Sequence, residues 1–393
     1  MMSDAFKIFK GLDKRCSQML YIIQREGTIT KNKLIDMTNI KKSTLNRTME
    51  VLINKKLIVE MASGESTGGR KPVLFSVNPG GYYLIGIDIS RTYIQVLITN
   101  LNMDILGEKI FDGVLSFDEA IKFISNCINE LINKLAIDIS MIIGAGIGAI
   151  GSKLYLEEND LDGNYANTVK DVLSEKLNLP FYMDNGANTA VMAEYYFGYG
   201  RGKHSVSYIN CGVGIRTGVI SDGILIRTIN NCEDAFGHMV VQMDGELCTC
   251  GNYGCVESYS SITRIKSKFI SEVKKGKSTN LTKSIDDVDY IDVCSLAESN
   301  DDLAKGIIID AATYFGTGLA NYIKLLDPEI IILSGPLIKY SELFYETSKK
   351  IVLQKCSSVN IENINFYRGG YFQNKSIALG AAYLALDEIM KSK

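Results

Sequence analysis

One histidine and three cysteines fall close together in the middle of the chain, at His238, Cys248, Cys250 and Cys255. Thiolate and imidazole groups together suit Zn²⁺, which takes four such ligands in a tetrahedron at structural sites. Two glycines inside the segment would let the backbone turn tightly enough for the last two cysteines to face one ion. The spacing, C-x-C followed by C-x4-C, differs from the C-x2-C pairs of ribbons and fingers. The segment predicts a metal centre, with unrelated buried cysteines as the alternative.

The composition is that of a soluble globular protein, with 46% apolar and 22% charged residues over a length of 393. This length suffices for two or three domains. No apolar run approaches the roughly 20 residues that span a bilayer, and the first residues lack the apolar core of a signal peptide. We therefore expect a cytoplasmic protein. Intracellular thiols stay reduced, which disfavours a disulfide among these cysteines.

Charge is distributed unevenly along the chain. Residues 1–80 hold 14 Lys+Arg against 7 Asp+Glu, so the remainder keeps 28 of the 42 Lys+Arg and 38 of the 45 Asp+Glu. A basic segment attached to an acidic body indicates that the segment meets a polyanion such as nucleic acid. Small domains vary in charge, so the balance alone leaves this interpretation open.

The same basic segment has the hydrophobic spacing of a helix-turn-helix. Apolar residues at helical intervals predict helices over 13–26 and 31–37, and a third that opens at Lys42 or Ser43. In a helix-turn-helix the second helix of the pair enters the major groove, and its N-terminal residues reach base edges. The alternative is a small helical domain that binds protein rather than DNA.

Two short expected strands, 57–60 and 73–77, enclose a Gly-rich loop and predict a wing. A basic wing tip could reach a phosphate or the minor groove. The side chains expected to contact DNA on the third helix and the wing are Lys42, Ser43, Thr44, Asn46, Arg47, Arg70 and Lys71.

The linker Asn78-Pro79-Gly80-Gly81 separates this segment from a body of alternating strands and helices. Buried strands are expected over 84–88, 93–99 and 105–114, followed by a helix over 117–135 and a strand over 141–147. The pattern alone supports an α/β fold and no finer class.

The cysteine segment resembles the zinc signature of the ROK family of repressors and sugar kinases, which reads Gly-His, a hairpin, then C-x-C-G-x-x-G-C-x-E. The resemblance implies that the histidine and three cysteines bind a structural Zn²⁺. It also implies that Glu257 and the second nitrogen of His238 face a sugar pocket, to which Asn185 contributes.

Family resemblance further implies the architecture. Residues 1–80, with the wing sequence Gly-Glu-Ser-x-Gly-Gly-Arg-x-Pro, resemble the winged helix-turn-helix of ROK repressors, which the family's sugar kinases lack. The body is then expected to have the two-lobed actin-like (RNase H-like) ROK sugar-kinase fold. Its first lobe would span 81–200 with the C-terminal helix 380–393, and its second lobe with the zinc site would span 201–379.

The phosphate loops of the family's kinases are altered in this chain. Their D-x-G-G-T motif, whose glycines admit nucleotide phosphates, is replaced by a segment in which Ser90 and Arg91 stand for the glycines. In the second loop, Val213 replaces a threonine and Arg216 a glycine. Gly-x-Gly alone also fits a plain hairpin. The resemblance thus implies that no ATP binds.

The acidic residues of the kinase site are also replaced. The segment Asp184-Asn185-Gly186 resembles the family's motif, but glycine stands where the kinases carry the acid that takes the proton from the sugar hydroxyl. Ala235 stands where the family's E-x-G-H motif has a sugar-binding glutamate. A turn rich in Asp, Asn and Gly without function is the alternative for the first segment.

We therefore expect a DNA-binding transcriptional regulator, a repressor of carbohydrate-use genes, with a catalytically inactive sugar-kinase body that senses a sugar. The expected partners are an operator DNA, a sugar effector and a second copy in a homodimer or larger oligomer. The chain resembles regulators of the xylose-repressor and N-acetylglucosamine-repressor type. The alternatives are an active sugar kinase and a regulator with a vestigial pocket that a partner protein controls. The sequence does not identify the effector or the operator.

Overall fold

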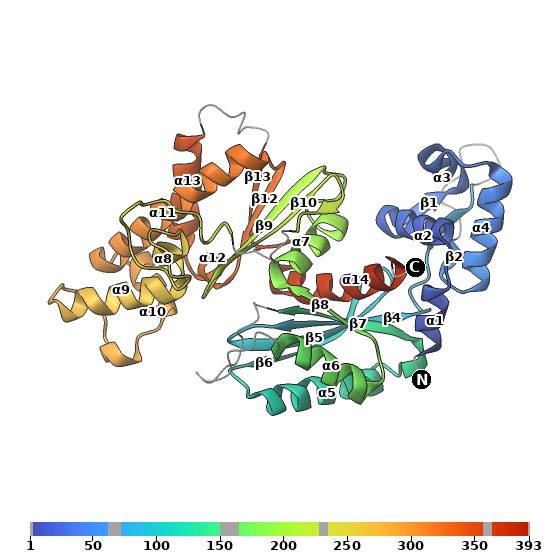
Figure 1. Cartoon of the computed structure of the whole chain (residues 1–393), viewed down its shortest axis with the longest axis horizontal. Coiled ribbons are helices and arrows are strands. Elements are labelled where there is room, and N and C mark those ends of the chain that lie inside the picture. The colour runs from blue at the N-terminus through green and yellow to red at the C-terminus, as the bar shows by residue number, and fades with distance from the viewer. Residues whose placement is uncertain (1–2, 62–71, 150–164, 228–234, 357–363, 392–393) are drawn as a thin grey trace. The chain divides into compact units, whose positions relative to one another are not determined.

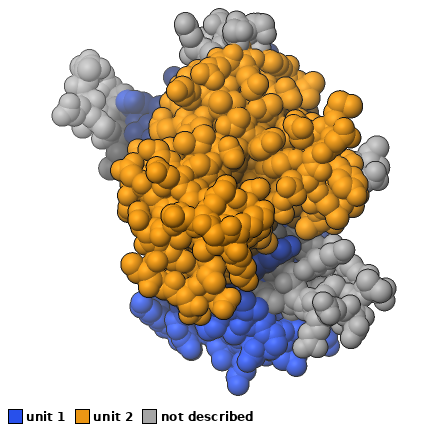
Figure 2. Space-filling model, turned by 90° about the vertical axis from the view of Figure 1, so that its left-hand side faces the viewer, with its two compact units in different colours: residues 1–197, 377–393 blue, residues 198–376 orange. Residues whose placement is uncertain are grey.

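The computed structural model describes residues 3–61, 72–149, 165–227, 235–356 and 364–391. The chain forms two compact units, shown in separate colours in Figure 2: Met1–Phe197 with Ile377–Lys393, and Gly198–Ser376. Figure 1 gives the helix and strand labels. Among the residues described, we find no helix with the length and apolar character needed to cross a membrane.

Four helices open the first unit: α1 (Asp4–Lys10), α2 (Lys14–Glu26), α3 (Lys31–Thr38) and α4 (Lys42–Asn54). The last three confirm the helices predicted from apolar spacing, whereas α1 was not predicted. Local capping fixes their starts, because Asp13 accepts a hydrogen bond from the Cys16 N–H and Thr30 accepts one from the Lys33 N–H.

A small antiparallel sheet accompanies these helices, in the order β1-β3-β2. It consists of β1 (Thr28–Thr30), β2 (Ile58–Met61) and β3 (Leu74–Val77), and the latter two confirm the expected strand pair. Arg70 and Lys71, expected at the tip of the wing, lie outside the described residues.

The first unit's main sheet has the order β6-β5-β4-β7-β8. Its strands are β4 (Tyr83–Ile89), β5 (Tyr93–Asn100), β6 (Ile105–Asp112), β7 (Ile142–Ala149) and β8 (Phe181–Asn185). β5 pairs antiparallel with β4 and β6, while β7 pairs parallel with β4 and β8. These elements confirm the strands expected over 84–88, 93–99, 105–114 and 141–147, although β6 ends two residues before Val114.

Helices α5 (Phe117–Lys134), α6 (Tyr165–Leu177), α7 (Gly186–Phe197) and α14 (Ser376–Lys391) accompany this sheet. The C-terminal helix begins at Ser376, so the prediction of a start at Gly380 was wrong. Gly380 lies inside the helix, where a Cβ would fall 1.6 Å from the Thr189 carbonyl oxygen. The glycine therefore marks a close approach of α14 to α7 and not a helix end.

The second unit has a five-stranded sheet in the order β11-β10-β9-β12-β13. Its strands are β9 (Ser205–Cys211), β10 (Ile215–Ser221), β11 (Ile224–Leu225), β12 (Ile330–Ser334) and β13 (Asn365–Arg368). Residues 215–218 belong to β10 and pair with β9, so the expectation that Arg216 lies in the second phosphate loop was wrong.

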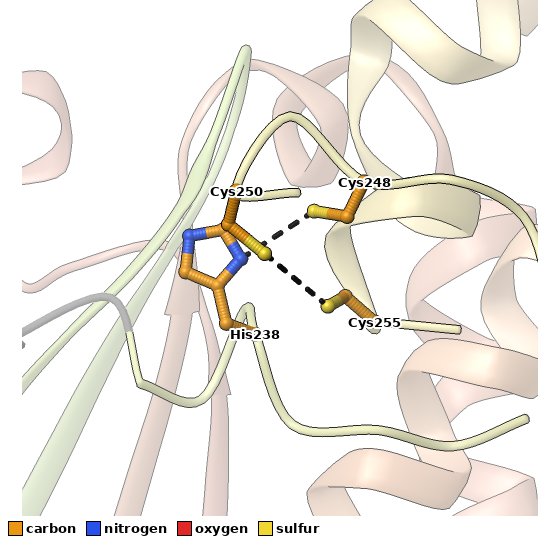
Figure 3. Close-up of side chains that lie close together, drawn as sticks. All are labelled: His238, Cys248, Cys250 and Cys255. Atoms are coloured by element: carbon orange, nitrogen blue, oxygen red, sulfur yellow. Dashed lines mark hydrogen bonds between the residues drawn. The ribbon is translucent and has the colours of Figure 1, made fainter. Parts of the chain in front are cut away.

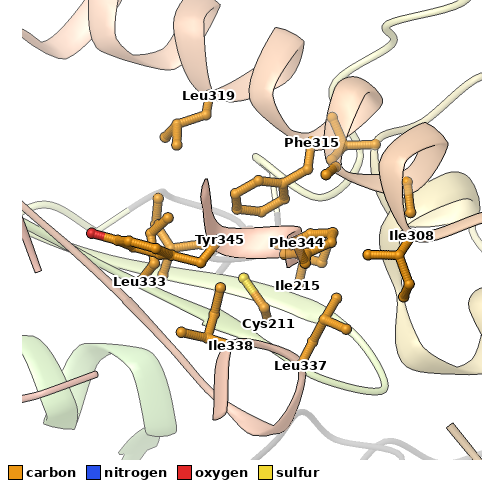
Figure 4. Packing of buried hydrophobic residues seen from close by; sticks show 14 of the residues in the cluster. Cys211, Ile215, Ile308, Phe315, Leu319, Leu333, Leu337, Ile338, Phe344 and Tyr345 are labelled. Atoms are coloured by element: carbon orange, nitrogen blue, oxygen red, sulfur yellow. The ribbon is translucent and has the colours of Figure 1, made fainter. Parts of the chain in front are cut away.

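The helices of the second unit are α8 (Glu257–Ser260), α9 (Ile262–Lys274), α10 (Tyr290–Glu298), α11 (Asp302–Leu326), α12 (Pro336–Tyr340) and α13 (Glu342–Lys355). Phe315 of α11 and Phe344 of α13 pack with their ring centroids 5.3 Å apart above the sheet residue Leu333 (Figure 4). This core borders the cysteine segment, because Val256 and Phe236 belong to the same buried cluster.

Candidate functional site

The four predicted metal ligands converge on one point in the second unit (Figure 3). His238 Nδ1 lies 3.5 Å from Cys248 Sγ, Cys250 Sγ lies 3.7 Å from Cys255 Sγ, and all four ligand atoms lie within 4.8 Å of one another. A tetrahedral ion with bonds of about 2.3 Å to sulfur and 2.0 Å to nitrogen needs ligand separations of about 3.5–3.8 Å. The cluster could therefore hold a metal ion, with Nδ1 as the imidazole ligand.

Backbone geometry places these ligands as the sequence predicted. The Cys248 N–H donates to the Asn252 carbonyl at 2.8 Å, and Val240 pairs with Cys255 in an antiparallel bridge. Gly254 has a φ of 72°, and a Cβ there would fall 1.6 Å from the Gln242 carbonyl oxygen. Only glycine fits this position, which brings Cys255 opposite the other ligands.

Glu257, expected to face a sugar, is held by an ion pair that the sequence did not predict. Its Oε2 accepts a hydrogen bond from the Ile215 N–H at 2.8 Å and lies 3.3 Å from Arg216 Nη1. Both side chains are largely buried, at 11% and 14% exposure. The same oxygen would lie 3.0 Å from a Cβ on Gly214. Arg216 and Glu257 therefore fill the space along the loop from Gly212 to Gly214.

Asn185 lies in the first unit, at the end of β8, whereas His238 and Glu257 belong to the second unit. Its Oδ1 accepts a hydrogen bond from the Ala187 N–H at 2.7 Å, so it caps α7. Asp184 Oδ1 accepts from Asn188 Nδ2 at 3.0 Å. A Cβ on Gly186 would meet Ile377 at 3.4 Å, an ordinary contact, so packing does not forbid a side chain there.

Asp88 survives from the D-x-G-G-T motif as a fully buried carboxyl group. Its Oδ2 accepts a hydrogen bond from the Tyr93 hydroxyl at 2.7 Å, and among the described residues its Oδ1 has no partner. Burial raises the pKa of Asp88 to about 7, although the Tyr93 hydrogen bond opposes the rise. The following residues form a tight turn, closed by the Ser90 N–H donating to the Tyr93 carbonyl at 2.9 Å.

We predict that Asp88→Asn flattens the dependence of stability on pH. Because the folded pKa lies above that of the unfolded chain, the native state binds more protons between about pH 4 and 7. The free energy of unfolding is therefore highest below pH 4, as far as Asp88 affects it. It falls by up to about 4 kcal/mol as the pH rises through 7. The amide keeps the shape without the charge, so the melting temperature at pH 8 should rise by a few degrees.

Thermal unfolding of both proteins at pH 5 and pH 8 tests this, with Asp104→Asn as the matched control on an accessible carboxylate. Equal slopes for wild type and Asp88→Asn would contradict it.

The residues expected to contact DNA on α4 lie on its accessible side. Lys42, Ser43, Asn46 and Arg47 are exposed and Thr44 is half-buried, whereas Leu45 and Met49 are buried. Ile53, near the end of the helix, is partly buried. Asn46 is held in place by Lys31, whose Nζ donates to its Oδ1 at 3.1 Å.

Comparison with known proteins gives a consistent result. The model of the ROK family matches residues 84–388, which is more than half of the chain. A xylose repressor from Caldicellulosiruptor bescii is 25% identical over 376 residues, which cover 92% of each chain.

Solved structures show the same fold. A ROK family transcriptional regulator described as a homolog of the E. coli MLC protein superposes with a TM-score of 0.78 at 20% identity, covering 96% of both chains. A ROK family glucokinase from Streptomyces griseus, solved with glucose and AMPPNP, superposes with a TM-score of 0.63 at 24% identity. It covers 78% of this chain and 99% of its own.

Proposed function

This chain belongs to the ROK family, and from that premise we propose that it is a DNA-binding transcriptional repressor of carbohydrate-use genes whose sugar-kinase-like body senses a sugar without phosphorylating it. The observation that carries the proposal is the set of helices α1 to α4 and strands β1 to β3, which precede the matched residues 84–388. The repressor relative spans 92% of the chain, whereas the glucokinase spans 78% of it.

We propose that residues 1–80 form a winged helix-turn-helix domain. We assign α3 and α4 as the helix pair, with α4 as the recognition helix, and β2 and β3 as the flanks of a wing. The accessible polar side of α4 supports this assignment, because base readout requires polar side chains that extend from the helix to the edges of the bases. Arg70 and Lys71 would then add phosphate or minor-groove contacts.

The body is proposed to lack kinase activity. Gly186 carries no group that could take a proton from a sugar hydroxyl, and removal of a general base costs about 10²–10⁴ in rate. Arg216 lies across the second phosphate loop, paired with Glu257. The first loop is a tight turn containing Arg91, with no glycine that would admit a phosphate. We therefore expect no ATP to bind.

We propose Zn²⁺ as the ion held by His238, Cys248, Cys250 and Cys255, because its preferred bond lengths reproduce the observed separations. When bound, the ion supplies four bonds that hold the loop in shape. The chain's own groups then do the recognition: Glu257 stays fixed against the Ile215 N–H, and we propose that the second nitrogen of His238 contacts the sugar, as the family resemblance implies.

Regulation is proposed to work by a population shift. A cytoplasmic homodimer would place two heads on a palindromic operator, whose half-site spacing matches one body arrangement. A sugar effector, for which the family resemblance implies Asn185, His238 and Glu257 as contacts, would favour another. Such an effector needs different affinities for the two arrangements.

The proposal is tested by selecting binding sequences from random double-stranded DNA with the full chain. We expect a palindromic sequence bound about 10³-fold or more tighter than unselected DNA. We also expect D-xylose, D-glucose or N-acetylglucosamine at millimolar concentration to weaken binding by about tenfold. Failure to enrich any sequence would overturn the assignment as a regulator.

The same sugars with labelled ATP provide the enzymatic control, and phosphorylated product would restore the kinase alternative. If DNA is selected but none of the sugars binds, a vestigial pocket with a partner protein becomes the better account.

A further inference from the structure

Helix α2 of the N-terminal domain docks on the body of the first unit through three polar side chains. The Tyr21 hydroxyl donates to Asp387 Oδ1 of α14 at 2.9 Å. Gln24, 7% exposed, donates through its amide to the Leu101 carbonyl. The guanidinium carbon of Arg25 lies 4.2 Å from the centre of the Tyr196 ring on α7. The domain is therefore tied to specific elements of the body and not merely tethered by its linker.

The aromatic side chains under these contacts form one cluster. Tyr383 of α14 is 1% exposed, and its ring lies 4.8 Å from Tyr196, 5.2 Å from Phe197 and 6.4 Å from Tyr21. Arg25 also hydrogen-bonds the side chains of Tyr196 and Tyr383. Burial raises the pKa of both phenols, which stay neutral while the cation rests on the ring.

The opposite end of α7 begins at the proposed sugar contact. Asn185 directly precedes the helix and caps it by accepting from the Ala187 N–H. From there the twelve residues Gly186–Phe197 form one helix, about 18 Å long at 1.5 Å per residue. A ligand that displaces Asn185 therefore displaces the first turn of α7. Tyr196 lies in the last turn of the same helix.

Close backbone packing makes α7 move with its neighbours as one piece. A Cβ on Gly380 of α14 would fall 1.6 Å from the Thr189 carbonyl of α7, and one on Gly146 of β7 would fall 1.8 Å from the Ala381 carbonyl. Helices in such contact leave no soft side-chain layer to absorb a displacement. A small shift at Asn185 is thus passed on to the cluster around Tyr196 and Tyr383.

We propose that α7 couples occupancy of Asn185 to the orientation of the DNA-binding domain, with Arg25 and Tyr196 as the positioning pair that transmits it. This inference rests on the proposed function, since it assigns the route between the sugar and DNA sites. Neither residue is among the proposed sugar or DNA contacts, so we expect their effect to be confined to the coupling between the two binding events.

The test uses Arg25→Gln, which removes the cation but keeps a polar side chain, in the full chain. Its matched control is Arg15→Gln, which loses the same charge from an exposed position on the same helix. Affinity for the DNA selected by wild type is measured by fluorescence anisotropy with and without D-xylose, D-glucose and N-acetylglucosamine. Calorimetry measures the affinity for each sugar.

For a sugar that weakens DNA binding by wild type, we expect Arg25→Gln to bind that sugar and DNA separately within about threefold of wild type. The ratio of DNA affinities with and without sugar should fall to within about twofold of one. Arg15→Gln should keep the wild-type ratio, and Arg25→Lys should keep part of it. Amide exchange in residues 14–26 should respond to the sugar in wild type and not in Arg25→Gln.

A full wild-type ratio in Arg25→Gln would overturn the α7 route while leaving the regulator intact. A wild-type protein that selects DNA but responds to none of the three sugars would overturn sensing itself, and this inference with it. The two failures are therefore distinguishable in one set of measurements.

Discussion

Cys255→Ser should release the metal and lower the melting temperature by about 10 °C or more, a larger change than that expected for Asp88→Asn. Structural Zn²⁺ contributes apparent binding free energies of about 10–16 kcal/mol in zinc-finger peptides. Cys255 is fully buried and its neighbour Val256 packs in the core of the second unit, so loss of the ion disturbs that core directly.

Metal content per chain and thermal unfolding, with and without a chelator, measure the effect. The matched control is Cys294→Ser, another fully buried cysteine of the second unit that lies outside the cluster. It should keep one metal ion per chain and lose only a modest amount of stability. Retention of the ion by Cys255→Ser, or its loss from Cys294→Ser, would contradict the ligand set.

Lowering the pH should weaken metal binding, as Cys255→Ser is expected to do. Burial raises the pKa of the Cys255 thiol to about 12, with the neighbouring cysteines adding to the rise, so binding an ion must displace a tightly held proton. Metal release by a fixed concentration of chelator should therefore become more complete as the pH is lowered.

Local sequence patterns predicted the parts of the structure that local interactions determine. The metal ligands lie within eighteen residues, and a positive-φ glycine between them leaves few ways to fold the segment. The helices α2 to α4 follow from apolar spacing and from caps such as Thr30. Each of these features depends on residues that are neighbours along the chain.

Contacts between distant residues were not predictable from such patterns. Arg216 could be recognised as a replacement for a glycine, but its pairing with Glu257 spans 41 positions and depends on the strand register. The contact of Arg25 with Tyr196 depends on two helices that meet only in the folded unit. Gly380 illustrates the reverse error, because a glycine that permits close packing looks in sequence like a helix boundary.

Arg47→Ala should weaken binding to the selected operator by roughly 5- to 150-fold, equivalent to about 1–3 kcal/mol, and relax specificity at the base it contacts. Arg47 is exposed on the second turn of α4, beside Asn46 and opposite the buried Leu45 and Met49. Because its side chain packs on nothing in the core, the melting temperature should stay within about 2 °C of wild type. The effect would then belong to recognition and not to folding.

The matched control is Arg15→Ala, which removes the same charge from the exposed side of α2. A lost phosphate contact weakens binding to all sequences alike and lowers the salt dependence by about one unit, whereas a lost base contact weakens the selected sequence more than a scrambled one. We expect the second pattern for Arg47→Ala and at most the first for Arg15→Ala. Equal losses on both DNAs for Arg47→Ala would mean that α4 is not the recognition helix. That result would leave the basic charge of residues 1–80 as a non-specific anchor for DNA.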